Sequence, residues 1–344
     1  MRAAVFHAPG DIRLEERPDP VLLEPTDAIV RVVLSCVCGS DLWYYRGQTP
    51  RAEGSPIGHE FVGVVEEVGP AARSLRPGEL VIAPFAFSDG TCPHCVHGAT
   101  SVCTNGGFWG AQRTDGGQGE RVRVPFAAAT LMPVPDVTPT DPILPALLAL
   151  SDVLPTGHHA AVCAGVAPGD TVAVIGDGAV GLSGILAARR LGAARIIALS
   201  RNPARQELAR RAGADEIVPA RGGEAIAAVL ELTDGVGADA TLECVGTAES
   251  MSTALGVARP LSRVGFVGVP HGASVPLPEM FARNVGLWGG VAPARAYLPE
   301  LLPDVLAGRL RPELVFDATF ALERVAEAYA AMDERRVTKA LLTV

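Results

Sequence analysis

The sequence has no long apolar run and no concentration of positive charge, and nothing in it reads as a secretion signal. No segment approaches the roughly 18 consecutive apolar residues that a membrane-spanning helix requires. Residues 1–7 lack the apolar stretch of a signal peptide. The net charge of −9 is spread along the chain, so no basic surface is available to a nucleic acid. We therefore expect a cytoplasmic protein with neither a membrane nor a nucleic-acid partner.

Cysteine is also scarce, with seven among 344 residues. An odd number of thiols in a reducing compartment argues against a disulfide framework. Three of them, Cys92, Cys95 and Cys103, nevertheless lie close together in the sequence. Such clustering in a cytoplasmic chain favours a metal site over redox pairing.

Charged residues make up only 19% of the chain and hydrophobic residues 48%, a composition that supports packed cores and argues against disorder. At roughly 100–200 residues per domain, the length favours two domains. Residues 1–150 are rich in Gly, Pro and short β-like runs, which predicts a β-rich part. From about residue 150, short apolar runs alternate with helical patterns, which predicts a doubly wound parallel sheet. Near residue 290 this alternation ends.

The predicted strands are residues 28–34, 61–68, 79–83, 171–175, 195–199, 216–218, 238–244 and 263–269. The predicted helices are residues 179–191, 203–212, 298–307 and 323–332. Residues 339–344 have the pattern of a further strand, which we expect to return to the first part of the chain. The expected fold class is thus α/β plus β-rich.

A glycine-rich turn separates the predicted strand 171–175 from the helix that follows. Its sequence fits G-x-G-x-x-G, and the strand–turn–helix context distinguishes a dinucleotide site from an ordinary glycine-rich turn. The glycines allow a tight turn and a close approach of the backbone to a pyrophosphate, which the helix N-terminus attracts. The expected contacts in this turn are Gly176, Gly178, Ala179, Val180 and Gly181.

The end of the second predicted strand indicates which dinucleotide is bound. NAD-binding folds usually carry an acidic residue there, which accepts a hydrogen bond from the ribose 2′-hydroxyl. This chain has Ser200 and Arg201, with Arg205 one helical turn later. A hydroxyl and guanidinium groups suit a 2′-phosphate, so we expect NADP(H) to be preferred over NAD(H). The alternative is that both arginines are solvated surface charges.

Two groups of residues have the chemistry of metal ligands. The first runs from Asp89 through Cys92 and Cys95 to Cys103, a spacing that can close a tetrahedral site. His94 and His97 are rival ligands, and three free thiols or an oxidised pair of cysteines are the alternatives.

The second group is dispersed and consists of Cys38, His59, Glu60 and Asp152. Taken singly, each residue has a simpler interpretation. Cys38 could be a buried thiol, His59 a core histidine and Asp152 a helix cap, with Glu60 merely adjacent to His59. Together, sulfur, imidazole and carboxylate form a set that suits zinc.

These motifs jointly resemble the zinc-containing medium-chain alcohol dehydrogenases over residues 2–344. The resemblance is carried by CVCGSDL (36–42), GHEFVGVVEEVG (58–69), the cysteine lobe (89–103), GERVRVP (119–125) and the GDGAVG turn. It implies a GroES-like catalytic domain formed by residues 1–150 and 290–344. It also implies an inserted Rossmann cofactor-binding domain formed by residues 151–289.

The resemblance assigns roles to the dispersed group. Cys38 and His59 match the first two catalytic zinc ligands, and Glu60 matches the adjacent glutamate that can enter the coordination shell. Asp152 falls at the variable third position, as in the NADP-dependent bacterial secondary alcohol dehydrogenases. Ser40 matches the hydroxyl that relays the substrate proton.

Asp89 stands where the family's structural lobe usually has its first cysteine, so we expect Asp89, Cys92, Cys95 and Cys103 to hold a structural zinc. Val245 and Val267 are further expected cofactor-binding residues. Trp43, Phe108, Trp109 and Trp288 are candidates to line a substrate pocket, although core packing is the simpler interpretation of each.

We therefore expect a zinc-dependent oxidoreductase that transfers a hydride between NADP(H) and an alcohol, aldehyde or ketone. A homodimer or homotetramer is implied by the resemblance. One alternative is a zinc-free enone or quinone reductase of the same superfamily, which the pair of Cys38 and His59 disfavours. A second is a non-catalytic, NADPH-binding redox sensor.

Overall fold

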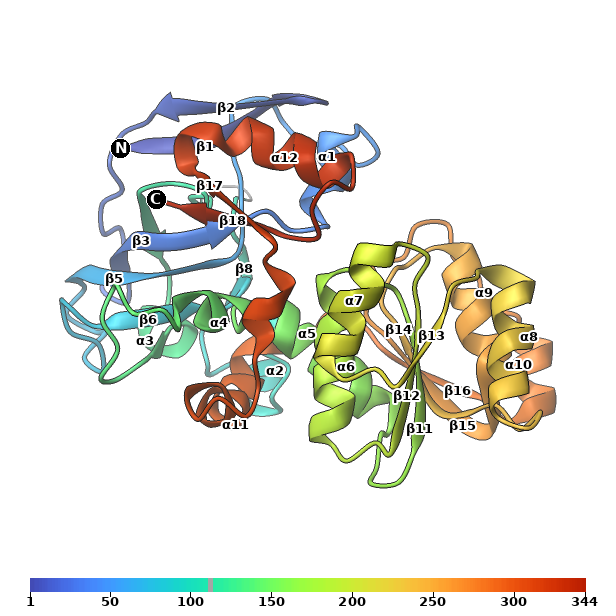
Figure 1. Ribbon diagram of the computed structural model, residues 1–344. Coiled ribbons are helices and arrows are strands. Elements are labelled where there is room, and N and C mark those ends of the chain that lie inside the picture. The colour runs from blue at the N-terminus through green and yellow to red at the C-terminus, as the bar shows by residue number, and fades with distance from the viewer. Residues whose placement is uncertain (111–113) are drawn as a thin grey trace. The chain divides into compact units, whose positions relative to one another are not determined.

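The computed structural model describes residues 1–110 and 114–344, and these residues divide into two compact units (Figure 1). The first unit consists of Met1–Asp152, Pro293–Arg309 and Phe316–Val344. The second consists of Val153–Ala292 and Leu310–Val315. Every helix within the described residues is too short or too polar to cross a membrane.

The first unit is β-rich. Its strands are β1 (Arg2–Ala8), β2 (Asp11–Glu16), β3 (Ala28–Cys36), β4 (Ser55–Pro56), β5 (Phe61–Val68), β6 (Leu80–Ala83), β7 (Ala86–Phe87), β8 (Gly107–Phe108), β9 (Arg121–Val124), β10 (Met132–Pro133), β17 (Ala318–Ala321) and β18 (Ala340–Thr343). Its helices are α1 (Asp41–Tyr45), α2 (Pro93–Val96), α3 (Ala127–Thr130), α4 (Leu144–Ala149), α11 (Ala294–Leu306) and α12 (Val325–Asp333), with 3₁₀ turns η1 (Thr100–Val102) and η3 (Leu322–Arg324).

The largest sheet of this unit has the order β10-β6-β5-β3-β18-β17, and β9 also pairs with β3. Strands β3 and β5 are dense in valine, and most of their residues are buried, as expected for β-branched side chains in a sheet interior. Strand β18 pairs antiparallel with β3, with Leu341 opposite Cys36. The tail of the chain therefore returns to the first part, as the sequence predicted.

The second unit is a six-stranded parallel sheet in the order β13-β12-β11-β14-β15-β16. Its strands are β11 (Thr171–Ile175), β12 (Arg195–Leu199), β13 (Glu216–Val218), β14 (Ala238–Glu243), β15 (Ala258–Phe266) and β16 (Gly286–Gly289). Its helices are α5 (Val153–Ala164), α6 (Ala179–Arg190), α7 (Pro203–Ala212), α8 (Gly222–Leu232), α9 (Ala248–Val257) and α10 (Leu277–Arg283), with the 3₁₀ turn η2 (Pro312–Val315).

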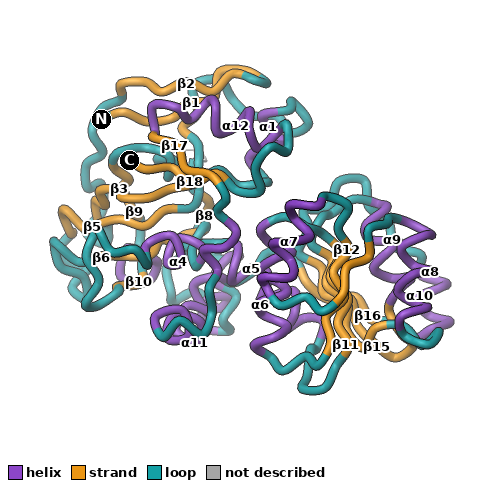
Figure 2. Tube along the Cα trace, viewed as in Figure 1, coloured by secondary structure: helices purple, strands orange, loops and turns teal. Residues whose placement is uncertain are grey.

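Helices cover both faces of this parallel sheet, α5, α6 and α7 on one and α8, α9 and α10 on the other (Figure 2). Strands β11 and β12, which both lie inside the sheet, are almost fully buried, and this explains their continuous apolar sequences. The strand order reverses direction between β11 and β14, and ligands of such sheets bind at the carboxyl ends of the strands at this point. The predicted fold class, a β-rich part plus a doubly wound parallel sheet, is confirmed.

Local sequence signals determine where helix α7, which carries the predicted cofactor residue Arg205, begins and ends. The Asn202 side chain accepts hydrogen bonds from the backbone N–H groups of Ala204 and Arg205, and Pro203 occupies the first turn. Gly213 ends the helix in the left-handed conformation, at φ +111°. These caps explain why the observed helix has the predicted limits.

Two sequence assignments need correction. Residues 310–315 were expected in the β-rich domain, but they pack on α6 and α7 and belong to the second unit. The strand expected at 263–269 is β15, which both begins and ends earlier, at Ala258 and Phe266: Ala258 already pairs with Ala238 of β14, and the pairing resumes at Arg263 after an irregularity. In both cases tertiary packing outweighs the local pattern.

Candidate active site and metal centres

Four residues that are far apart in the sequence meet in the first unit. Cys38 follows β3, His59 and Glu60 precede β5, and Asp152 follows α4. One ligand atom from each lies within 4.8 Å of all the others. The sheet brings the first three together because β3 and β5 are paired neighbours.

The distances between these atoms suit a tetrahedral metal ion. Cys38 Sγ lies 3.8 Å from Asp152 Oδ2, and His59 Nε2 lies 3.3 Å from the same oxygen. Zinc bonds of about 2.0–2.3 Å in a tetrahedron put neighbouring ligand atoms about 3.3–3.8 Å apart. Cys38, His59 and Asp152 therefore fit a zinc ion without rearrangement.

Asp41, the last polar residue of the CVCGSD motif, orients His59. Its Oδ1 lies 3.3 Å from His59 Nδ1, and its Oδ2 accepts the backbone N–H of Cys38 at 3.0 Å. Burial alone would lower the pKa of His59, but the charges of Asp41 and Cys38 outweigh it and raise that pKa well above its usual value. A carboxylate on Nδ1 favours the tautomer that leaves Nε2 free to bind a metal.

Asp41 is itself held by buried polar groups. The Gln118 side chain donates to Asp41 Oδ2 at 3.4 Å and to the Cys36 carbonyl at 3.0 Å. Tyr329, from α12, donates to Gln118 Oε1 at 3.0 Å. A continuous hydrogen-bonded path thus connects helix α12 to the candidate ligand His59.

Glu60 forms a fully buried ion pair with Lys339. Lys339 Nζ donates to Glu60 Oε1 at 2.6 Å, and both side chains are almost inaccessible to solvent. Glu60 Oε2 is buried and has no hydrogen-bond partner among the described residues. One carboxylate oxygen is therefore held by the lysine, while the other is available to a cation in the cluster.

Burial raises the pKa of Cys38 above that of an ordinary thiol. Its thiolate, which is the form that binds metal, therefore requires a cation beside it. Ser40, the residue expected to relay a proton, lies two positions after Cys38 at the start of α1 and is half-buried.

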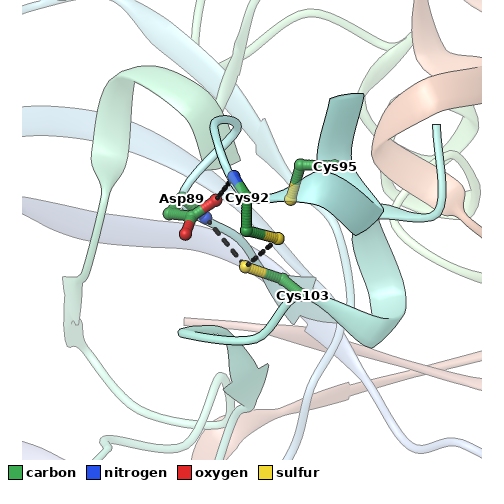
Figure 3. A group of neighbouring side chains, drawn as sticks. All are labelled: Asp89, Cys92, Cys95 and Cys103. Atoms are coloured by element: carbon green, nitrogen blue, oxygen red, sulfur yellow. Dashed lines mark hydrogen bonds between the residues drawn. The ribbon is translucent and has the colours of Figure 1, made fainter. Parts of the chain in front are cut away.

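The second predicted metal group forms a small lobe between β7 and β8. Asp89, Cys92, Cys95 and Cys103 each offer one ligand atom, again within 4.8 Å of one another (Figure 3). Cys92 Sγ and Cys103 Sγ lie 3.8 Å apart, close to the edge of a zinc–sulfur tetrahedron. Neither His94 nor His97 is part of this group.

Asp89 also organises the backbone of the lobe. Its Oδ1 accepts the N–H groups of Thr91 at 2.8 Å and Cys92 at 2.9 Å, and its Oδ2 accepts from Asn105 at 2.7 Å. These hydrogen bonds, first among them the one from Cys92, hold the pKa of Asp89 well below its usual range. Asp89 therefore stays ionised and adds a negatively charged oxygen to the three thiols of the lobe.

Two of the lobe thiols, Cys92 and Cys95, differ in acidity. Backbone N–H groups of Cys95 and Thr104 lower the pKa of Cys92 to about 6, whereas burial raises the pKa of Cys95 to about 12. The Cys92 thiolate is thus available at neutral pH to start metal binding, and the bound cation would favour ionisation of Cys95.

The glycine-rich turn connects β11 to α6 as predicted. Gly176 has φ +122°, a conformation that L side chains rarely adopt. A Cβ on Gly181 would lie 2.0 Å from the Gly176 carbonyl oxygen, so only glycine allows this close packing of helix against strand. A Cβ on Gly178 would meet no protein atom within 4 Å, so its backbone faces open space, as a pyrophosphate site requires. Ala179 and Val180 begin α6 at this turn.

The predicted 2′-phosphate residues lie at the end of β12 but are not all free. Ser200 is buried and its hydroxyl donates to Asp177 Oδ2 at 2.9 Å. Arg205 Nη1 lies 3.2 Å from Asp177 Oδ1. Arg201 is exposed. The turn residue Asp177 thus binds two of the three groups expected to contact a phosphate.

Val245 and Val267 follow β14 and β15, at the same edge of the sheet as the glycine turn. Val245 is adjacent to Gly176, since a Cβ there would lie 3.0 Å from the valine side chain. The buried carboxylate of Glu243 accepts the N–H groups of Val245 at 2.9 Å and Gly246 at 2.8 Å, which fixes this loop.

The aromatic candidates separate into core and surface residues. Trp109 is buried, donates to the Pro84 carbonyl at 2.7 Å and packs edge-on against Phe61, so it belongs to the core. Phe108 stacks on Phe85 and is partly exposed.

Trp288 lies on β16 and is largely exposed, and Trp43 belongs to α1. These positions assign no substrate contact to any of the four.

The sequence analysis missed four residues that support these sites, namely Asp41, Lys339, Asp177 and Glu243. Asp41 and Asp177 lie within the motifs CVCGSD and GDGAVG, so the motifs themselves carried the signal. Lys339 and Glu243 have no local signal, because their roles depend on strands that meet only in the folded chain.

Comparison with known proteins identifies the family to which this chain belongs. Residues 24–136 match the family profile described as "Alcohol dehydrogenase GroES-like domain", and residues 179–306 match "Zinc-binding dehydrogenase". The chain is 33% identical to zinc-type alcohol dehydrogenase B from Aspergillus flavus, over 99% of this chain and 81% of that protein.

Solved structures agree with the sequence relatives. The alcohol dehydrogenase TADH from Thermus sp. ATN1 superposes with a TM-score of 0.92 at 36% identity, with full coverage of both chains. A Sinorhizobium meliloti protein assigned as a zinc-binding dehydrogenase and solved with bound NADP superposes with a TM-score of 0.83 at 25% identity, over 100% of this chain and 99% of that one. The chain belongs to the zinc-containing medium-chain alcohol dehydrogenase family.

Proposed function

We propose that this chain is a zinc-dependent dehydrogenase that interconverts an alcohol with its aldehyde or ketone and prefers NADP(H). The observation that carries this proposal is the buried cluster of Cys38, His59 and Asp152, with spacings that suit zinc. In this proposal the β-rich unit is the catalytic domain and the parallel-sheet unit is the cofactor-binding domain.

Cys38, His59 and Asp152 would hold the catalytic zinc, with Glu60 as an additional carboxylate. When bound, zinc supplies Lewis acidity toward the substrate oxygen and the nicotinamide supplies or accepts the hydride. During oxidation Ser40 Oγ would accept the hydroxyl proton of the substrate while releasing its own proton toward solvent, and during reduction the transfers would run in reverse.

Asp41 keeps the imidazole of His59 in one orientation and one tautomer throughout. Lys339 compensates the charge of Glu60 where water cannot. These residues also help to exclude water from the cluster. Charge interactions are stronger in a site without water.

The glycine turn and the end of β12 would bind the dinucleotide. The pyrophosphate would lie against Gly176, Gly178 and Gly181. The 2′-phosphate would contact Ser200 and Arg201. The related Sinorhizobium meliloti structure with bound NADP gives weak support for this preference.

Asp89, Cys92, Cys95 and Cys103 would hold a structural zinc that fixes their lobe. The reduced thiols that both clusters require agree with a cytoplasmic location. A homodimeric or homotetrameric assembly is part of the proposal, and light scattering with size-exclusion chromatography would test it.

The decisive assay measures kcat/KM with NADPH and with NADH over a panel of alcohols, aldehydes and ketones, before and after removal of metal. We expect activity that disappears with chelation, returns with zinc and is higher with NADPH. Full activity after complete removal of metal would contradict the zinc mechanism. Activity confined to enones or quinones would favour the zinc-free reductases of the superfamily.

A further inference from the structure

Asp177 occupies an unexpected position in the second unit. It is the second residue of the glycine turn after β11, yet its carboxylate reaches the end of the neighbouring strand β12. There it accepts the Ser200 hydroxyl at 2.9 Å and lies 3.2 Å from the Arg205 guanidinium. Only 14% of the Asp177 side chain and 11% of the Arg205 side chain are exposed.

The end of the second strand is where a dinucleotide-binding fold distinguishes a ribose 2′-hydroxyl from a 2′-phosphate. A carboxylate at this point accepts from the hydroxyl and repels the phosphate. This chain has a serine at the strand end, but the charge of a carboxylate is nevertheless present, supplied by the adjacent turn. The sequence pattern alone therefore overstates the preference for a phosphate.

Ser200 and Arg205 are two of the three groups expected to contact a 2′-phosphate, and both are bound to Asp177. A phosphate must therefore compete with the carboxylate for them and must also tolerate its charge at close range. A 2′-hydroxyl meets neither obstacle, because it can donate to a carboxylate.

We propose that Asp177 is a specificity-determining residue that lowers the preference for NADP(H) over NAD(H), so that the chain uses both dinucleotides. This inference rests on the proposed dehydrogenase function and on the dinucleotide site of the second unit. Arg201, which is exposed beside Ser200, provides the positive charge that remains available to a phosphate.

To test this inference, we would measure the dissociation constants of NADPH, NADH, 2′,5′-ADP and 5′-AMP for the full-length wild type and for Asp177→Asn. The asparagine has the same shape and can still accept from Ser200, but it lacks the charge. The nucleotides 2′,5′-ADP and 5′-AMP report the adenosine end alone, so this measurement does not depend on zinc or on a substrate.

Asp239→Asn is the matched control. Asp239 also pairs with an arginine, Arg259, at 2.7 Å. It also accepts the backbone N–H of Thr171, at the start of β11, and so lies at the opposite edge of the same sheet. This variant removes the same charge from the same unit, away from the glycine turn.

We expect Asp177→Asn to raise the ratio of NADH to NADPH dissociation constants at least about tenfold, with a parallel change for 5′-AMP and 2′,5′-ADP. Asp239→Asn should leave both ratios unchanged. A purely structural role for Asp177 would weaken all four ligands equally, and an unchanged or lower ratio would overturn the inference. Asp177→Ser provides a second neutral variant and must shift the ratios in the same direction.

The outcomes also separate this inference from the proposed function. A wild type that binds NADPH, combined with unchanged ratios in both neutral variants, rejects only the role of Asp177. A wild type that binds neither NADPH nor NADH rejects the dinucleotide site, and the role of Asp177 with it.

Discussion

The two clusters of metal-ligand residues have similar chemistry but are built in opposite ways. In the lobe, Asp89 and Cys103 are only 14 positions apart, and hydrogen bonds from nearby backbone groups set the geometry. In the buried cluster, Cys38 and Asp152 are 114 positions apart, and the packing of α4 on β3 and β5 brings them together. We therefore expect a bound metal to contribute more to the stability of the local lobe than to that of the dispersed cluster, which the packed sheet and α4 hold in place.

This difference predicts different responses to mutation. Loss of a ligand from the buried cluster should affect chemistry more than stability, because β3, β5 and α4 remain packed. Loss of a ligand from the lobe should affect stability more than chemistry, because the lobe has little core of its own. The following variants test this contrast.

The largest effect is expected for Cys38→Ala. It should lower kcat/KM by at least about 1,000-fold, because several kcal/mol of Lewis-acid stabilisation are lost. Cys95→Ala is the counterpart in the lobe and should lower the melting temperature by about 5–10 °C while most of the activity is retained. Steady-state kinetics and calorimetry on both variants provide the check, and the contrast fails if their effects are the same.

Lys339→Met should destabilise the protein by about 3 kcal/mol, because it leaves the charge of Glu60 buried without its partner. The double variant with Glu60→Gln should recover a large part of this loss, because both charges are then absent. Urea denaturation of the two single variants and the double variant measures the coupling. Additive losses would show that the pair does not interact.

Asp41→Asn should weaken zinc binding in the buried cluster by about 10–100-fold, because the histidine loses the carboxylate that orients it. Asp27→Asn is the control, since Asp27 is also buried in the first unit but pairs with Arg123 at 2.7 Å. Competition with a chromogenic chelator gives the affinities. Equal weakening in both variants would indicate a general loss of stability in place of ligand orientation.

The smallest effect is expected for Asp89→Asn. The amide oxygen can still accept the N–H groups of Thr91 and Cys92, but it is a poorer metal ligand than a carboxylate. We expect the zinc affinity of the lobe to fall by less than about tenfold, because three thiolates remain. A complete loss of lobe zinc in this variant would show that Asp89 matters as much as the cysteines.

The sequence predicted much of the fold because its signals are local. The caps of α7 and the continuous apolar runs of β11 and β12 depend on neighbouring residues, and their limits were predicted correctly. The six residues 310–315 carry no periodic pattern, so only their packing on α6 and α7 reveals their place.

The candidate sites were predictable to a lesser degree. Motifs and the family resemblance indicated the candidate ligand residues, but the pair of Lys339 and Glu60 joins positions 279 apart and has no signature in either segment. The NADP preference was inferred from Ser200 and Arg201 without the carboxylate of Asp177, because a contact between a turn and a neighbouring strand is visible only in three dimensions.

The most direct test of the account is the zinc content per chain, measured together with activity, for the wild type, Cys38→Ala and Cys95→Ala. We expect about two zinc ions in the wild type and about one in each variant, with activity lost only in Cys38→Ala. A Cys38→Ala protein that keeps the wild-type zinc content and full activity would contradict the assignment of the buried cluster as the catalytic metal site.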